Sequence, residues 1–150
     1  MTSASTWRLS AAAPAADMKP RQLRQCFETG ALKLSGKDQK SSGSGSYAGL
    51  SKPRVYQAAI MKHLHRSGLS IPHAARAAFE FSNVGNIDRA PGELFAHGKT
   101  VLLITPNGTT VKNIFSDTSF SDVSNGSACV ITVDLNRVVE QVDTLLTKIS

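Results

Sequence analysis

Residues 17–34 read DMKPRQLRQCFETGALKL, and this stretch decides the fold of the first half of the chain. Proline is favoured in the first turn of a helix, so Lys19 and Pro20 predict a helix start. Apolar side chains then recur at the i, i+3 and i+4 spacing of one helix face: Leu23, Cys26 and Phe27. Gly30 is typical of the position just after a helix ends. The stretch therefore predicts a short helix with an apolar inner side and a basic outer side.

A second short helix is predicted in front of it. Residues 7–16 are rich in alanine, with Ser10 placed to cap a helix and Pro14 limiting its length. Asp17 and Met18 form a break between the two. Two short helices with a break of a few residues between them make a helix-turn-helix candidate.

The segment after Gly30 is rich in glycine, serine and lysine. Residues 31–34 and 46–48 are strand-like and flank this loop. They predict a flexible hairpin with three lysines towards its tip: Lys33, Lys37 and Lys40. The alternative interpretation is a plain solvated loop.

Residues 52–81 predict two more helices. Pro53 begins the first and Gly68 ends it, while Ser70 caps the second, with Pro72 in its first turn. The expected buried side chains are Val55, Ala58, Ala59, Met61 and Leu64 in the first helix and Ala74, Ala75, Ala78 and Phe79 in the second. The turn-rich residues 83–92 predict a boundary between a domain at 1–82 and a unit at 93–150.

The second half changes to a strand pattern. Residues 99–105 and 109–115 are β-branched runs joined by Pro-Asn-Gly, a strong hairpin signal, and residues 129–133 predict a third strand. Asp134 can then cap a closing helix. Its apolar stripe is Leu135, Val138, Val139, Val142, Leu145, Leu146 and Ile149. We expect the stripe to pack on its own hairpin, or to form a two-helix seam with a second copy of the chain.

Charge is distributed unevenly over the 150 residues. The net charge is +6, but residues 1–76 hold 12 basic and 3 acidic residues, whereas residues 77–150 hold 5 basic and 8 acidic ones. A basic first half joined to a mildly acidic second half indicates a polyanion-binding part and a part with another role.

Several functional classes find no support in the sequence. No basic-apolar leader and no apolar run of membrane-spanning length is present, which predicts a soluble, cytoplasmic protein. Cys26 and Cys129 are far apart, which argues against a disulfide framework and a zinc site. The four histidines lack chelating spacing: His63, His65, His73 and His97. No catalytic motif appears, so we expect neither enzymatic activity nor a cofactor nor a metal.

Residues 17–34 resemble the DNA-binding region of the MerR family. The matching residues are Met18, Pro20, Leu23, Arg24, Phe27, Glu28, Gly30 and Leu32, with Tyr47 and the segment SGLSIPHAA (67–75) following in the family's order. The resemblance covers roughly residues 7–82 and implies a winged helix-turn-helix. The paired aromatics of the family are reduced to Cys26 and Phe27, and its long dimerising helix is replaced by strands and one helix. The expected fold class is thus α+β: an N-terminal winged helix-turn-helix of four short helices with a small wing hairpin, followed by a small three-stranded sheet plus a C-terminal helix.

The resemblance and the chemistry of the side chains together indicate which residues would bind DNA. Arginine can bind guanine and glutamine adenine through paired hydrogen bonds in the major groove. Arg21, Gln22 and Gln25 are the expected base readers, and Arg24 is expected to grip phosphate or a base edge. The expected backbone and wing contacts are Ser10, Lys19, Lys37, Lys40, Tyr47, Lys52 and Arg54.

The expected function is a sequence-specific, double-stranded DNA-binding transcriptional regulator of bacterial or phage type, associated with the nucleoid. It would bind as a homodimer, through Leu135, Val138, Val142, Leu145 and Ile149, with residues 19–28 in the major groove. RNA polymerase and a second regulator are possible further partners. The alternatives are an excisionase-like factor that bends DNA and an antitoxin-type protein-interaction module.

Overall fold

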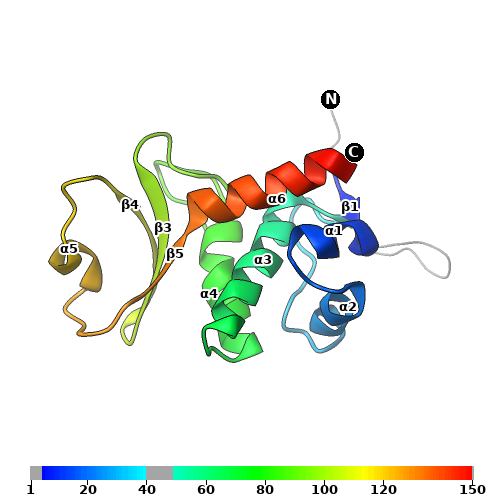
Figure 1. Ribbon diagram of the computed structural model, residues 1–150, viewed down its shortest axis with the longest axis horizontal. Coiled ribbons are helices and arrows are strands. Elements are labelled where there is room, and N and C mark those ends of the chain that lie inside the picture. Colours follow the sequence, from blue (N-terminus) through cyan, green and yellow to red (C-terminus); the bar gives the residue numbers. More distant parts are fainter. Residues whose placement is uncertain (1–4, 40–48, 150) are drawn as a thin grey trace.

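The computed structural model describes residues 5–39 and 49–149, which form six helices and two small antiparallel sheets (Figure 1). The helices are α1 (Leu9–Ala15), α2 (Pro20–Glu28), α3 (Lys52–Arg66), α4 (Ile71–Ser82), α5 (Phe120–Ser124) and α6 (Leu135–Ile149). The strands are β1 (Trp7–Arg8), β2 (Gly49–Leu50), β3 (Lys99–Thr105), β4 (Gly108–Ile114) and β5 (Ile131–Asp134). The mixed α and β character and the three-stranded sheet followed by a C-terminal helix agree with the expected class.

Local signals place the helix starts. α2 begins at Pro20 directly after Lys19, and Gly30 follows its end with φ +83°. The Ser70 hydroxyl accepts a hydrogen bond from the N–H of His73 at 3.3 Å, as expected for the α4 cap. The predicted cap of α1 is wrong. Trp7 and Arg8 pair with β2, so α1 starts at Leu9, and Ser10 lies inside its first turn without capping it.

The predicted strand at 31–34 is also wrong. This segment has no strand structure, and Leu32 is instead buried in the core. Pairing begins later, where Gln39 and Gly49 exchange two backbone hydrogen bonds of 2.7 and 2.8 Å. Gly49 also pairs with Arg8, so the chain on either side of residues 40–48 joins a short ladder beside α1.

The packing of α4 differs from the prediction at one residue. Phe79 is 42% exposed, whereas Ala77 and Phe81 are buried together with Ala74, Ala75 and Ala78. Phe79 and Phe81 are two positions apart and therefore face different directions on a helix. The Tyr56 ring lies 6.1 Å from the Phe81 ring and completes the contact between α3 and α4.

The second sheet has the order β4-β3-β5, with β3 in the centre. Thr105 pairs with Gly108, so the two-residue turn is Pro106-Asn107, and β4 begins at Gly108 rather than at the expected residue 109. The third strand is Ile131–Asp134 rather than 129–133, and Cys129 is exposed outside it. α5, which the sequence analysis did not anticipate, lies between β4 and β5. The Asp122 carboxylate accepts the Ser119 N–H at 2.8 Å at its start.

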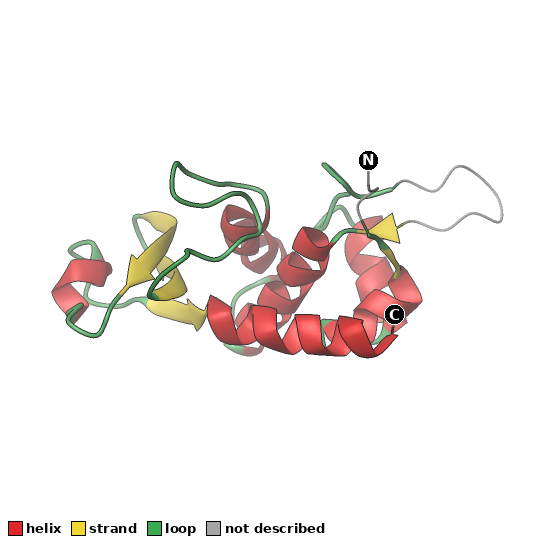
Figure 2. Cartoon of the chain, turned by 90° about the horizontal axis from the view of Figure 1, so that it is seen from above, coloured by secondary structure: helices red, strands yellow, loops and turns green. Residues whose placement is uncertain are grey.

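α6 runs along the helical part from β5 towards α1 (Figures 1 and 2). The Asp134 carboxylate accepts the N–H of Arg137 at 3.2 Å, as expected for its cap. Part of the helix contacts β3, but most of its inner face lies against α1 and α3. The expected packing on its own hairpin therefore describes only part of the contact.

Most of the α6 stripe is buried within its own chain. Four inner side chains are at most 5% exposed: Leu135, Val138, Val142 and Leu146. Only Leu145, at 38%, and Ile149, at 46%, are appreciably exposed among the residues named for the seam. A second copy therefore cannot use Leu135, Val138 and Val142, because they already pack inside their own chain.

The buried side chains of both halves form one hydrophobic cluster, which joins Leu23 and Ile60 to Leu102 and Leu146. Arg89 holds together the segment between the two halves of the chain. Its guanidinium donates hydrogen bonds to the backbone carbonyl oxygens of Glu80, Phe81, Val84, Ala90 and Glu93. The segment is thus held to the end of α4. None of the helices in the described part of the chain has the length and apolarity that a membrane crossing requires.

Candidate nucleic-acid interface

α2 divides cleanly into a buried and an exposed side. Leu23 is fully buried and Cys26 is 7% exposed, whereas Arg21, Arg24 and Gln25 are exposed. At 3.6 residues per turn the three exposed residues fall within about 100° of the helix circumference. The helix therefore presents two guanidinium groups and one carboxamide together.

Cys26 serves to pack α2 onto the core. Burial raises the pKa of its thiol, and the nearby Lys62 opposes that shift only in part. A thiol of raised pKa is a poor nucleophile, because the thiolate is the reactive form.

Gln22 is placed differently from its neighbours. Its side-chain oxygen accepts the backbone N–H of Lys19 at 3.1 Å, which satisfies a donor at the helix start. This hydrogen bond turns the carboxamide back along the helix. Gln22 is thus engaged in capping, while Gln25 stays on the outer face.

The turn that sets the direction of α2 is fixed by contacts to α1 and α3. Asp17 has φ +57°, a left-handed conformation that asparagine and aspartate adopt more readily than most residues. Its carboxylate accepts from the Arg66 guanidinium at 2.6 Å. The N–H of Met18 donates to the Ala13 carbonyl at 2.9 Å, and the Met18 side chain is buried. α2 therefore leaves the turn in one defined direction.

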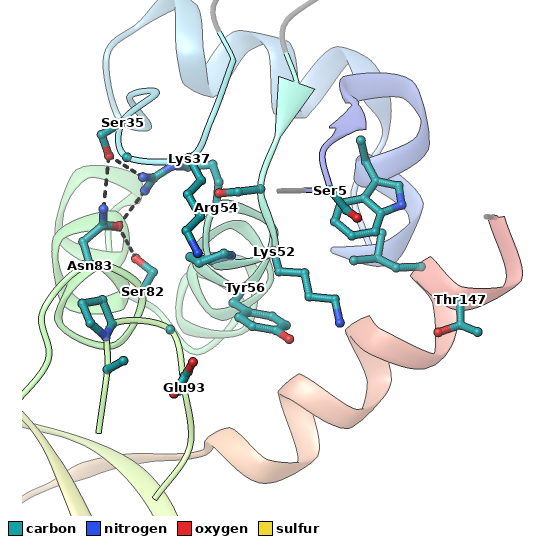
Figure 3. Close-up of a pocket in the computed structure, with 18 residues that line it drawn as sticks. Ser5, Ser35, Lys37, Lys52, Arg54, Tyr56, Ser82, Asn83, Glu93 and Thr147 are labelled. Carbon is teal, nitrogen blue, oxygen red and sulfur yellow. Dashed lines mark hydrogen bonds between the residues drawn. The ribbon is translucent and has the colours of Figure 1, made fainter. Parts of the chain in front are cut away.

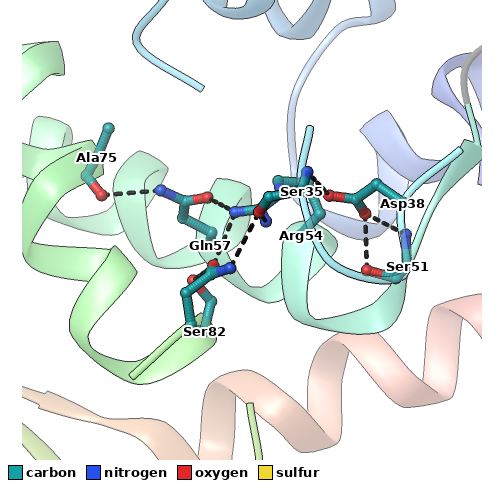
Figure 4. A network of polar contacts seen from close by, with 8 residues as sticks. Ser35, Asp38, Ser51, Arg54, Gln57, Ala75 and Ser82 are labelled. Atoms are coloured by element: carbon teal, nitrogen blue, oxygen red, sulfur yellow. Dashed lines mark hydrogen bonds and ion pairs between the residues drawn. The ribbon is translucent and has the colours of Figure 1, made fainter. Parts of the chain in front are cut away.

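Arg54 is buried, so the prediction that it contacts DNA is wrong. The residue is 1% exposed, and its Nε donates to Asp38 Oδ2 at 2.8 Å in a buried ion pair (Figure 4). The guanidinium also donates to Ser35 Oγ at 2.6 Å, to Asn83 Oδ1 at 2.9 Å and to Gln57. Its hydrogen-bonding groups are turned inward, so none reaches a phosphate.

Asp38 links the same network to the start of α3. One carboxylate oxygen accepts both the N–H and the hydroxyl of Ser51, at 2.8 and 2.7 Å. The other accepts the N–H of Ser35 at 2.9 Å, in addition to the Arg54 contact. The base of the segment that carries Lys37 is thereby held against α3.

The remaining nominated residues are dispersed. Ser10 and Lys19 are exposed near the starts of α1 and α2. Lys37 and Lys52 are exposed and line one cavity, which no α2 residue lines, and Lys52 Nζ lies 3.7 Å from Asp143 Oδ1. Lys40 and Tyr47 lie outside the described residues.

Sequence reasoning missed two residues beside α2. Lys62 and His65 of α3 line a cavity of about 490 Å³ together with Gln22, Gln25 and Cys26. They bring further basic side chains next to the exposed side of α2. Some forty positions separate them from α2 in the sequence, and no local pattern signals the proximity.

In residues 5–39 and 49–149 no group of three His, Cys, Asp or Glu side chains is placed to hold a metal ion.

The chain was also compared with known proteins. No family model matches it, and no curated protein is detectably similar.

Proposed function

We propose that the protein binds double-stranded DNA in a sequence-specific manner, with α2 as the recognition helix, and acts as a transcriptional regulator. The observation that carries the proposal is the outward face of α2. Arg21, Arg24 and Gln25 are exposed side by side, while Leu23 and Cys26 anchor the helix in the core. A helix anchored in this way can place its polar side in a DNA groove while its apolar side stays packed in the core.

The side chains on this face have the chemistry of base readers. Arginine forms two hydrogen bonds to the O6 and N7 atoms of guanine, and glutamine does so with the N6 and N7 atoms of adenine. Lys19 at the start of the helix, and Lys62 beside it, supply positive charge for the phosphates.

The short ladder next to α1 supports the same proposal. Gln39 and Gly49 are paired, and the intervening residues 40–48 contain Lys40 and Tyr47. In a winged helix-turn-helix the wing follows the recognition helix in the chain and contacts the DNA backbone beside the major groove, and the paired Gln39 and Gly49 lie at that place in the chain order. The proposal thus assigns α1 and α2 to the helix-turn-helix and the paired segment to the base of the wing.

A selection from random duplexes tests the proposal. Bound duplexes would be recovered with the full chain and the winning sequence titrated with wild-type protein, Arg24→Ala and the control Arg137→Ala. Arg137 is exposed on α6, away from α2 in the sequence. We expect a defined motif, a loss of about 1–3 kcal/mol for Arg24→Ala, and a much smaller change for Arg137→Ala.

Other outcomes would redirect the assignment. Weak binding without a motif that disappears as salt rises would contradict sequence-specific recognition, because counterion release alone explains such binding. Tandem copies of one site covered cooperatively would favour the DNA-bending alternative. Absence of all DNA binding at moderate salt would favour the protein-interaction alternative.

A further inference from the structure

A cavity of about 870 Å³ lies between the base of the proposed wing, the start of α3, the loop after α4 and the end of α6 (Figure 3). Its lining comes from five segments that are distant in the sequence, and none belongs to α2. It is therefore separate from α2, the proposed recognition helix.

Two hydrogen-bonded networks hold the walls of this cavity in place. On one side, Arg54 ties Ser35 and Asp38 to α3 and to Asn83 (Figure 4). On the other, Arg89 donates to the carbonyl oxygens of Ala90 and Glu93 and holds that loop to the end of α4. A cavity between fixed walls is preformed, which lowers the entropic cost of binding a ligand.

The apolar part of the lining is made largely of rings. Trp7 contributes an aromatic surface and Pro53 and Pro91 contribute rigid rings, whereas Tyr56 is 5% exposed and contributes little. Surfaces of this kind favour a planar, apolar group, because aromatic rings pack by stacking or edge-to-face contact.

The charged part of the lining favours an anion. Lys37 and Lys52 place two ammonium groups at the cavity (Figure 3), whereas Arg54 is occupied by Asp38. Lys52 shares its charge with Asp143 at 3.7 Å, and Glu93 adds one carboxylate to the lining. With Lys52 paired to Asp143 and Arg54 to Asp38, Lys37 is the ammonium group at the cavity that has no carboxylate of the described residues within ion-pair distance, and one such group suits a single negative charge better than two.

We propose that this cavity binds a small aromatic monocarboxylate. The carboxylate contacts the ammonium groups of Lys37 and Lys52, and the ring lies against Trp7. Such a ligand joins the base of the proposed wing to α6.

The single tryptophan of the chain gives a direct readout. Because Trp7 lines the cavity, the indole N–H signal in a ¹H–¹⁵N spectrum of the full chain reports on occupation. Titration with 1-naphthoate is expected to shift this signal saturably. The neutral analogue 1-naphthamide is expected to bind about tenfold more weakly, since it lacks the charge-assisted hydrogen bonds. The dianion 1-naphthyl phosphate is expected to bind no more tightly than 1-naphthoate.

Three variants complete the test. Lys37→Met removes an ammonium group and Ala90→Phe fills part of the cavity, and each is expected to weaken 1-naphthoate binding about tenfold. Lys148→Met removes a lysine from α6 that does not line the cavity, and it is expected to leave binding unchanged.

The proposal is overturned if 1-naphthoate gives no saturable shift, if 1-naphthamide binds equally well, or if Lys37→Met and Lys148→Met behave alike. Tighter binding of 1-naphthyl phosphate would overturn the assignment of a monoanion. The titration contains no DNA, and Arg24→Ala is expected to retain 1-naphthoate binding. A failure here is thus separable from a failure of DNA recognition.

Discussion

The Arg54 guanidinium and the Asp38 carboxylate form a buried ion pair, with Nε and Oδ2 2.8 Å apart and side chains that are 2% and 0% exposed. A charge removed from water in this way is tolerated only when its partner and hydrogen bonds are present. Ser51 and Ser35 on the Asp38 side, and Asn83 and Ser35 on the Arg54 side, supply them. The pair therefore connects the base of the proposed wing to α3 and α4.

Removing one partner of this pair should destabilise the protein strongly. Arg54→Met leaves the Asp38 carboxylate buried without its cation, and we expect the free energy of unfolding to fall by about 3–5 kcal/mol. Urea denaturation followed by circular dichroism measures this change. Arg24→Met, on the exposed side of α2, serves as the matched control and should alter stability by at most about 0.5 kcal/mol.

The double variant Arg54→Met/Asp38→Leu tests whether the unpaired Asp38 carboxylate causes the loss of stability. With both charges gone, the uncompensated carboxylate disappears, and stability should recover in part relative to Arg54→Met. Equal stability of Arg54→Met and wild type would show that the pair is not buried in solution.

The hydrogen bond from the Tyr56 hydroxyl to Asp143 Oδ1, 2.5 Å long, attaches α6 to α3. Tyr56→Phe removes the donor, and we expect a loss of about 1–3 kcal/mol, because a hydrogen bond to a charged acceptor is stronger than a neutral one. Urea denaturation of Tyr56→Phe, Asp143→Asn and the double variant gives the coupling between the two residues. Strictly additive effects of the single changes would contradict the contact.

The same tyrosine predicts a dependence of stability on alkaline pH. Burial first, and then the hydrogen bond and charge of Asp143, raise the pKa of Tyr56 above its usual value near 10. Its contribution to stability is thus fully present below pH 10 and is lost as the pH rises through the folded-state pKa. The chain has two tyrosines, so the variant Tyr47→Phe leaves Tyr56 alone. Its absorbance at 295 nm should show no tyrosinate near pH 10 until unfolding begins, and a normal titration there would refute the prediction.

Local signals in the sequence predicted the elements well, but their burial less well. Pro20 and Ser70 act through the backbone within a few residues, and each starts a helix where expected; the predicted hairpin also forms, with its second strand starting one residue earlier, at Gly108. Arg54 shows the limit. Its charge is visible in the sequence, but its partner Asp38 lies 16 residues away in a segment without a recognisable pattern.

The choice between Phe79 and Phe81 shows the same limit. Both are apolar residues near the end of α4, and which of them is buried depends on the position of α3 and Tyr56. The element that packs against α6 also depends on the tertiary structure. An apolar stripe predicts that one face of the helix is covered, but it does not predict which element covers it.

The α6 stripe predicts a contrast between neighbouring leucines. Leu146 is 1% exposed and Leu145 is 38% exposed. Leu146→Ala should cost about 2–5 kcal/mol of unfolding free energy, since it removes buried methyl groups and leaves a cavity. Leu145→Ala should cost far less if its exposed side chain contacts no partner. Denaturation at several protein concentrations distinguishes the cases: a large, concentration-dependent cost for Leu145→Ala would show that a second copy covers this edge.

Within the proposed interface, Lys19 and Gln25 should affect DNA binding in different ways. Lys19 lies at the start of α2, where a phosphate contact is expected, so Lys19→Ala should weaken binding to all sequences and lower the slope of log K against log salt by about 1. Gln25 is exposed on the outer face, and Gln25→Ala should change the preference at one base pair, by about 1–3 kcal/mol, while leaving the salt slope unaltered. Titrations of the selected duplex and of its single-base variants at several salt concentrations measure both effects. Equal losses on every sequence for Gln25→Ala would mean that α2 contacts only the backbone, and the recognition helix would then have to be sought elsewhere in the chain.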